Sequence, residues 1–133
     1  MAHLTLEYSA NLRAGGDFAG LCARLAACMA AQRDGDKAIF PVGGIRVRAI
    51  ACEDYCIADG APDAGFVHAI LKMGAGRSEA VRNATCGALF ELIKQHFARQ
   101  FAAQGLALSL EASEFSEAGT WKHNNLHARF KKA

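Results

Sequence analysis

Three arginines in this sequence stand where a small protein could bind an anion. Arg77 lies in the segment Gly74-Ala-Gly-Arg77-Ser78, which joins an alternating apolar stretch to a long amphipathic one. A turn that leads into a helix presents free backbone amides, and a guanidinium can hold a carboxylate with two hydrogen bonds. Arg46 and Arg48 are two residues apart and would lie on one face of another strand. These residues predict a site for a small carboxylate ligand.

Each arginine also has a structural interpretation. Arg77 could lie on the surface of a turn that only needs its glycines. Arg46 and Arg48 could belong to a network of ion pairs with Glu7 or Glu111. We prefer the network for Arg48, and for Arg46 both interpretations stay open.

No pattern in the sequence is typical of a metal or nucleotide site. The five histidines show no metal spacing, and Cys52-x-x-x-Cys56 is not a standard zinc pair. A Gly-x-Ser-x-Gly elbow, a phosphate-binding loop and a dinucleotide glycine fingerprint are all absent from the sequence. We therefore expect neither a metal nor a cofactor.

Composition and charge predict one ordinary domain over residues 1–133. The chain is 52% hydrophobic and 21% charged, and its net charge of +2 is too small to indicate nucleic-acid binding. Lys131 and Lys132 form only a short basic tail. With no apolar run of membrane-spanning length, no secretory signal and an odd number of cysteines, we expect a cytoplasmic protein that does not bind membranes.

Hydrophobic periodicity predicts the elements that must position these arginines. Strict alternation is typical of half-buried strands, and we expect four of them, at residues 3–8, 45–52, 66–73 and 106–113. Helical spacing of apolar residues predicts two helices. The first has Asp17 as its N-cap and ends near Gly35, and the second begins near Ser78 and ends at Gly105.

This order predicts an α/β (α+β) fold of two βαβ units that form one four-stranded sheet, with both helices on one face. The other face would mix charged side chains with Phe66, Ile50 and Ile70. Such a mixture fits an oligomer interface in which opposite charges pair, and this is the interpretation we favour. A half-solvated open face on a monomer is the alternative.

Several short motifs, taken together in their order, resemble the 5-carboxymethyl-2-hydroxymuconate isomerase family of the tautomerase superfamily, over nearly the whole chain. The motifs are His3-Leu-Thr-Leu-Glu7, Phe40-Pro-Val-Gly-Gly-Ile-Arg46-Val-Arg48, Ala58-Asp-Gly60, Phe66-Val-His68, Lys72-Met-Gly-Ala-Gly-Arg-Ser78, Leu89-Phe-Glu-Leu-Ile-Lys94, Lys122-His-Asn-Asn125 and His127-Ala128.

The resemblance implies a homotrimer with sheets at its centre, and a cofactor-free proton shift. Members of the family convert a dienol to an unsaturated ketone on a hydroxymuconate-type dicarboxylate, in the catabolism of homoprotocatechuate-type aromatic acids. Arg46 and Arg77 match the arginines that hold the substrate carboxylates and stabilise the enolate charge. From their positions alone, Phe40 and Phe66 are candidates for the apolar lining of the pocket.

The sequence departs from the family at the catalytic base. In the family this base is an N-terminal proline, which is exposed when the initiator methionine is removed. Ala2 takes that position here. Alanine also permits methionine removal and would supply a primary amine, whose pKa is about 7.7–8.0 when unperturbed. If Met1 stays, Ala2 carries only an amide nitrogen, which is no base. The alternative to an isomerase is therefore a catalytically impaired relative that only binds carboxylates.

Overall fold

The computed structural model describes residues 1–130, so Lys131 and Lys132 lie outside the described part of the chain. The strands of the main sheet are β1 (Ala2–Ser9), β4 (Ile45–Cys52), β5 (Gly65–Gly74) and β6 (Leu106–Phe115). The helices are α1 (Arg13–Gly16), α2 (Phe18–Ala31), α3 (Glu79–His96), α4 (Ala98–Ala103) and α5 (Leu126–Phe130). A small hairpin consists of β2 (Arg33–Asp34) and β3 (Lys37–Ala38).

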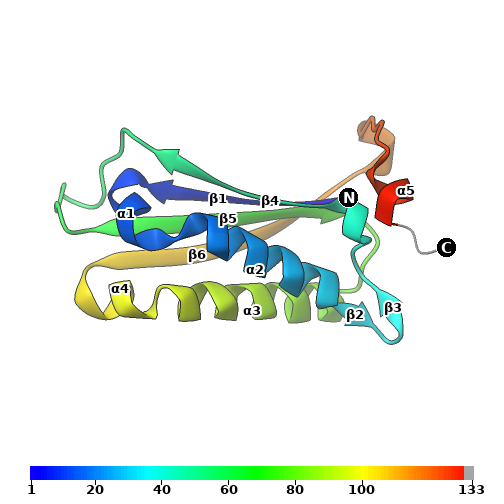
Figure 1. Ribbon diagram of the computed structural model, residues 1–133, viewed down its shortest axis with the longest axis horizontal. Coiled ribbons are helices and arrows are strands. Elements are labelled where there is room, and N and C mark those ends of the chain that lie inside the picture. Colours follow the sequence, from blue (N-terminus) through cyan, green and yellow to red (C-terminus); the bar gives the residue numbers. More distant parts are fainter. Residues whose placement is uncertain (131–133) are drawn as a thin grey trace.

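The main sheet has the strand order β4-β1-β5-β6. β1 and β4 are parallel, as are β5 and β6, whereas the two central strands β1 and β5 are antiparallel. Each parallel pair is joined by one long helical crossover, and Figure 1 shows α2 and α3 on the same side of the sheet. The predicted fold of two βαβ units with both helices on one face is confirmed.

The core lies between the sheet and the two long helices because alternate strand residues point toward them. Leu4 and Leu6 on β1 and Leu71 on β5 are fully buried, and Leu25 on α2 and Leu89 on α3 pack in the same cluster. Burial of each such side chain contributes about 1.5–3 kcal/mol relative to exposure. The sheet therefore has one buried face, and its position relative to the helices is fixed.

Both predicted helices are shorter than expected. α2 ends at Ala31, and Gly35, with a φ of +62°, sits in the turn of the β2–β3 hairpin. The second helix is interrupted at Phe97, whose backbone leaves the helical region at φ −102° and ψ 17°. Phe101, which follows this break on α4, is 61% exposed.

The other face of the sheet is open in a single chain. His68 on β5 contacts Ser109 and Glu111 on β6, and Arg48 on β4 donates to the ring of His3. Ile50 on the same face is 50% exposed. The predicted mixture of charged and apolar side chains is thus present on this face.

The C-terminal segment returns to the beginning of the chain. Asn124 accepts a hydrogen bond from the backbone of Leu126 at the start of α5, and α5 packs against the 3₁₀ turn Val42–Gly44. A side chain at Gly43 would lie 2.8 Å from the backbone nitrogen of His127, so this close approach requires glycine. Figure 1 shows α5 beside the N-terminus.

Candidate active site

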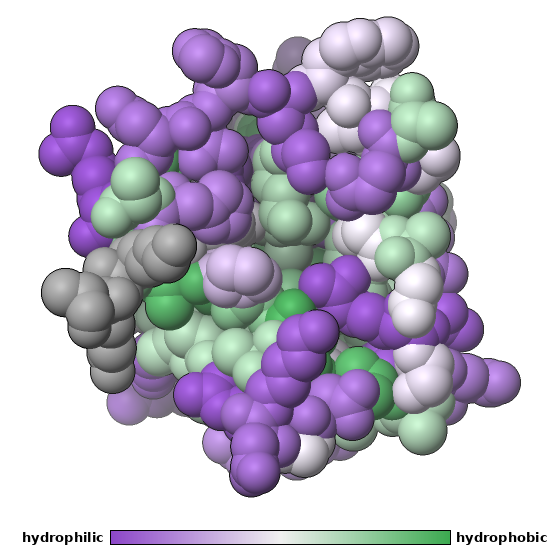
Figure 2. Space-filling model, turned by 90° about the vertical axis from the view of Figure 1, so that its right-hand side faces the viewer, coloured by the Kyte–Doolittle hydropathy of each residue, from purple (hydrophilic) through white to green (hydrophobic). Residues whose placement is uncertain are grey.

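A cavity of about 550 Å³ opens at the end of the sheet where β1 begins and β5 ends. Figure 2 looks onto this end of the molecule and shows hydrophilic side chains around a hollow with an apolar floor. The cavity is lined by Met1, the hairpin residues Asp34, Lys37 and Ala38, the following Ile39, the segment Gly74–Ser78, Val81 and Glu117. The segment singled out in the sequence therefore forms one wall of a concave site.

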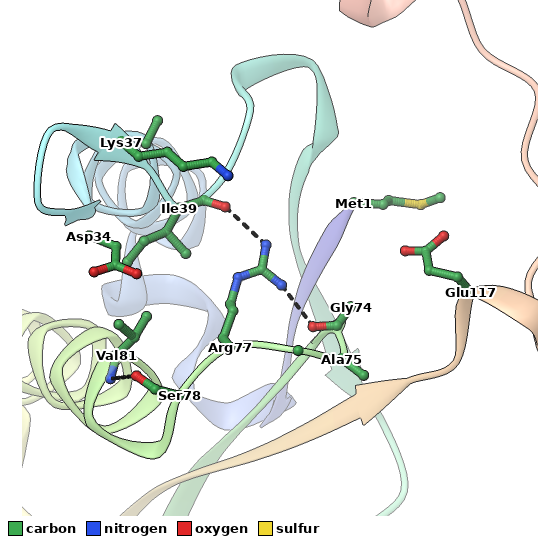
Figure 3. A pocket seen from close by; sticks show the side chains of 12 residues that line it. Met1, Asp34, Lys37, Ile39, Gly74, Ala75, Arg77, Ser78, Val81 and Glu117 are labelled. Carbon is green, nitrogen blue, oxygen red and sulfur yellow. Dashed lines mark hydrogen bonds between the residues drawn. The ribbon is translucent and has the colours of Figure 1, made fainter.

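Arg77 is held in place by backbone carbonyl groups on two sides of the cavity. One guanidinium nitrogen donates to the carbonyl oxygen of Gly74 at 2.7 Å, and the other donates to that of Ile39 at 2.9 Å (Figure 3). The guanidinium also lies over the ring of Phe40, 5.1 Å from its centre. The charge is therefore fixed in position before any ligand arrives.

The turn that carries Arg77 ends at a well-capped helix. The Ser78 side chain accepts a hydrogen bond from the backbone of Val81, so Ser78 is the N-cap of α3. Gly76, in the turn, has a φ of +113°, which strongly favours glycine. These local features place Arg77 at the N-terminal end of a long helix, where negative charge is stabilised.

Met1, which carries the terminal amino group, lines the cavity together with Arg77. Burial lowers the pKa of this amine below its usual range, and the positive charges of Lys122, Arg77 and Arg46 lower it further, whereas Glu117 opposes them. An amine with a lowered pKa is unprotonated in a larger fraction of molecules at neutral pH. The residue that carries this basic nitrogen therefore lines the same cavity as an anion-binding group.

Glu117 and Lys122 form an ion pair of 2.8 Å at the edge of the cavity. The hydrogen bond from Lys122, together with its charge, lowers the pKa of Glu117, which is therefore ionised at neutral pH. Figure 3 shows the Glu117 carboxylate turned toward Met1. The negative charge of Glu117 raises the pKa of the amine and so opposes the lowering by the nearby cations.

Arg46 lies near the amine but on the open face of the sheet. It stands opposite His3 in the register of β4 and β1, and it donates to the carbonyl oxygen of Gly43 at 3.2 Å. Its charge contributes to the lowered pKa of Met1, although Arg46 does not line the cavity. Arg77 and Arg46 thus approach the beginning of the chain from different sides.

The remaining predicted residues lie at different distances from this site. Ala2 is fully buried and opposite Met73, the residue before Gly74. Phe40 is buried beneath Arg77. Phe66 is at the opposite end of β5, where its ring contacts Tyr55, so a single chain does not bring Phe66 to the cavity.

Sequence reasoning missed the wall formed by the β2–β3 hairpin. Asp34 and Lys37 face each other across its turn and both line the cavity. The signal was present in Gly35-Asp36, because a two-residue loop of Gly followed by Asp between two short stretches is a hairpin pattern. The helix predicted from the apolar periodicity of α2 extended to Gly35 and so included the first strand of the hairpin.

Two further properties concern other kinds of site. Residues 1–130 contain no cluster of three or more His, Cys, Asp or Glu side chains arranged to hold a metal ion. None of the helices in this part of the chain is long and apolar enough to cross a membrane.

Comparison with solved structures first defines the fold class. Native fused 4-OT aligns with 96% of this chain and 97% of its own, with a TM-score of 0.62 and 19% identity. A macrophage migration inhibitory factor-like protein from Entamoeba histolytica aligns with 92% of this chain and 95% of its own, with a TM-score of 0.59 and 11% identity. At these identities the likeness concerns the fold alone, which this chain shares with both of these proteins.

Closer relatives define the family. The family model for 5-carboxymethyl-2-hydroxymuconate isomerase matches residues 2–130. The chain is 42% identical to the Escherichia coli 5-carboxymethyl-2-hydroxymuconate Delta-isomerase, over 98% of this chain and all of the relative. A 5-carboxymethyl-2-hydroxymuconate isomerase from Deinococcus radiodurans R1 has 51% identity, a TM-score of 0.90 and coverage of 98% of this chain and 95% of its own. The chain therefore belongs to the 5-carboxymethyl-2-hydroxymuconate isomerase family.

Proposed function

We propose that this protein is a cofactor-independent isomerase that shifts a proton along a hydroxymuconate-type unsaturated carboxylate during the catabolism of aromatic acids. The observation that carries the proposal is that the beginning of the chain lies beside Arg77, since Met1 and Arg77 line one cavity, in a family whose named members are isomerases of 5-carboxymethyl-2-hydroxymuconate. Arg77 makes hydrogen bonds only to backbone carbonyls among residues 1–130, so its charge is available to a substrate carboxylate.

The proposed reaction needs one base and one anion-binding group. The unprotonated amine removes the proton from the enol hydroxyl of the substrate, and the resulting dienolate is stabilised by the guanidinium charge. The same nitrogen, now an ammonium group, returns the proton to a carbon at the other end of the conjugated system. The product is the unsaturated ketone, and the amine is regenerated without any cofactor.

The nitrogen that acts in this scheme is that of Ala2, after removal of Met1. Ala2 begins β1 opposite Met73, and the neighbouring Gly74 carbonyl binds Arg77, so an amine on Ala2 would face the same guanidinium. Removal of Met1 also frees the part of the cavity that Met1 lines. Arg46 is the second group proposed to bind a substrate carboxylate, from the open face of the sheet, and Phe40 supports Arg77 from below.

The proposed assembly is a homotrimer located in the cytoplasm. An open sheet face that carries charged side chains beside the half-exposed Ile50 favours association between copies. A structure titled fused 4-OT wild type symmetric trimer shares the fold, with a TM-score of 0.60. Five free cysteines are consistent with a reducing compartment. If Phe66 contributes to a pocket, it does so across such an interface.

A second candidate function is carboxylate binding without turnover, and the observation that favours it is Ala2 itself. A primary amine lacks the fixed direction of the proline ring, and a misplacement of about 1 Å can cost about a hundredfold in rate. It can also form an imine with a carbonyl compound. Binding and turnover must therefore be measured separately.

Ultraviolet monitoring of 5-carboxymethyl-2-hydroxymuconate with protein of verified mass tests the proposal. Faster conversion to the unsaturated ketone than in buffer supports the isomerase, and its loss in Arg77→Ala assigns it to this cavity. Calorimetric binding without acceleration favours the second function. If a chain that starts at Ala2 neither binds nor accelerates the conversion of this substrate, both candidate functions are contradicted.

A further inference from the structure

The candidate cavity contains more cationic charge than its acidic residues neutralise. Lys37 forms no ion pair and no hydrogen bond within residues 1–130. The hydrogen bonds of Arg77 go to backbone carbonyls. Of the two acidic side chains in the lining, Glu117 is paired with Lys122, and Asp34 lies within no salt-bridge distance of a cation in the described chain. Two unpaired cations facing one hollow are suited to an anionic ligand.

The two cations belong to elements that are tied together. Ile39 directly follows the β2–β3 hairpin, and its carbonyl oxygen accepts a hydrogen bond from Arg77 at 2.9 Å. The backbone nitrogen of Ile39 donates to the carbonyl of Gln32 at 3.1 Å, which closes the base of the hairpin. The position of Lys37 relative to Arg77 is therefore set by backbone contacts.

Lys37 and Asp34 are cross-strand neighbours that do not bond to each other. Figure 3 shows the Lys37 side chain running from the hairpin toward Arg77, while the Asp34 carboxylate lies on the other side of Ile39. Because Lys37 points away from Asp34 and toward Arg77 (Figure 3), its ammonium group is available to an anionic ligand.

The chemistry of the proposed substrate leaves one negative charge without a partner. A muconate has two carboxylates, and a carboxymethyl substituent adds a third. Arg77 and Arg46 account for two of them in the proposed function. We propose that Lys37 of the β2–β3 hairpin binds the carboxymethyl carboxylate, and that the hairpin therefore sets the preference for a substituted hydroxymuconate over an unsubstituted one. This inference rests on the proposed function and names its substrate class.

The expected effect is modest because Lys37 is exposed to solvent. Exposed ion pairs contribute little, and hydrogen bonds to charged groups contribute more, so loss of this contact should cost about three- to tenfold in affinity. Salt screens an exposed contact, so the preference should weaken as ionic strength rises.

The test compares two substrates, 5-carboxymethyl-2-hydroxymuconate and 2-hydroxymuconate, which lacks the carboxymethyl group. Lys37→Gln should lower kcat/KM about three- to tenfold for the first substrate and leave it unchanged for the second. Lys37→Arg should retain most of the preference because it keeps the charge. Lys94→Gln is the matched control, since Lys94 is an exposed lysine on α3 that does not line the cavity, and it should change neither value.

Failure of this inference differs from failure of the proposed function. If the wild-type protein converts both substrates and Lys37→Gln changes neither or both equally, Lys37 is not the carboxymethyl-binding residue. If the wild-type protein neither binds nor converts either substrate, the proposed function itself is contradicted. A loss restricted to the substituted substrate supports the assignment.

Discussion

Replacing Arg77 with lysine separates charge from geometry at the centre of the cavity. The arginine donates to two carbonyl groups, of Gly74 and Ile39, and lies over the ring of Phe40. A lysine ammonium is a point charge on a flexible stem and cannot reproduce this fork. Loss of one hydrogen bond costs about 0.5–1.5 kcal/mol and loss of the cation–π contact about 0.5–1 kcal/mol. We expect Arg77→Lys to lower the free energy of unfolding by about 1–2.5 kcal/mol.

The same substitution should affect turnover more than stability. A carboxylate held by two charge-assisted hydrogen bonds loses one of them, which corresponds to about 1.5–3 kcal/mol, or about ten- to a hundredfold in kcat/KM. Urea unfolding and the ultraviolet assay measure the two effects, with Arg99→Lys as the control, because Arg99 is an exposed arginine that does not line this cavity. Wild-type values of both quantities in Arg77→Lys would refute the account of Arg77.

Three further predictions concern the surroundings of the site. Gly43→Ala should displace α5 because its side chain would lie 2.8 Å from a backbone nitrogen, and hydrogen exchange should then be faster in residues 126–130; unchanged exchange would contradict this packing. Burial and the charge of Arg48 lower the pKa of His3, so the unfolded chain binds the proton more tightly, and the free energy of unfolding should fall as pH drops below about 6.5. Urea unfolding at pH 7.5 and 5.5 should show a smaller difference in this free energy for His3→Gln than for the wild-type protein. An equal difference in both proteins would exclude His3 as the cause of the pH dependence. Ala2→Pro, with Met1 removed, should raise kcat/KM by about ten- to a hundredfold because the ring fixes the direction of the nitrogen, whereas an unchanged rate in the ultraviolet assay would show that direction is not limiting.

The main sheet could be predicted from the sequence because its periodicity is strict. Ile45–Cys52 was predicted with both of its bounds, and Gly65–Gly74 to within one residue at each end. One face of each strand must be buried, so apolar residues have to occupy every second position of the strand, and this pattern is visible in the sequence. The interruption of the second helix at Phe97 could not be predicted in this way, because an apolar residue fits the helical stripe on either side of a break.

The candidate site could be predicted only in part. Arg77 was found because glycines and a helix start mark its turn in the sequence. Lys37 and Glu117 were missed because each reaches the cavity through a tertiary contact, Lys37 from the hairpin and Glu117 from the turn after β6. The positions of Arg46 and Phe66 relative to the cavity likewise depend on which face and which end of the sheet each residue occupies.

The central claim is that a terminal amine beside Arg77 moves the proton. The most direct measurement compares two homogeneous preparations, one that starts at Ala2 and one that retains Met1, each verified by intact mass, in the ultraviolet assay with 5-carboxymethyl-2-hydroxymuconate. The account predicts acceleration only in the chain that starts at Ala2, because in the other preparation the Ala2 nitrogen is an amide and the amine of Met1 lies one residue away from the position that acts. Equal rates in the two preparations would contradict it.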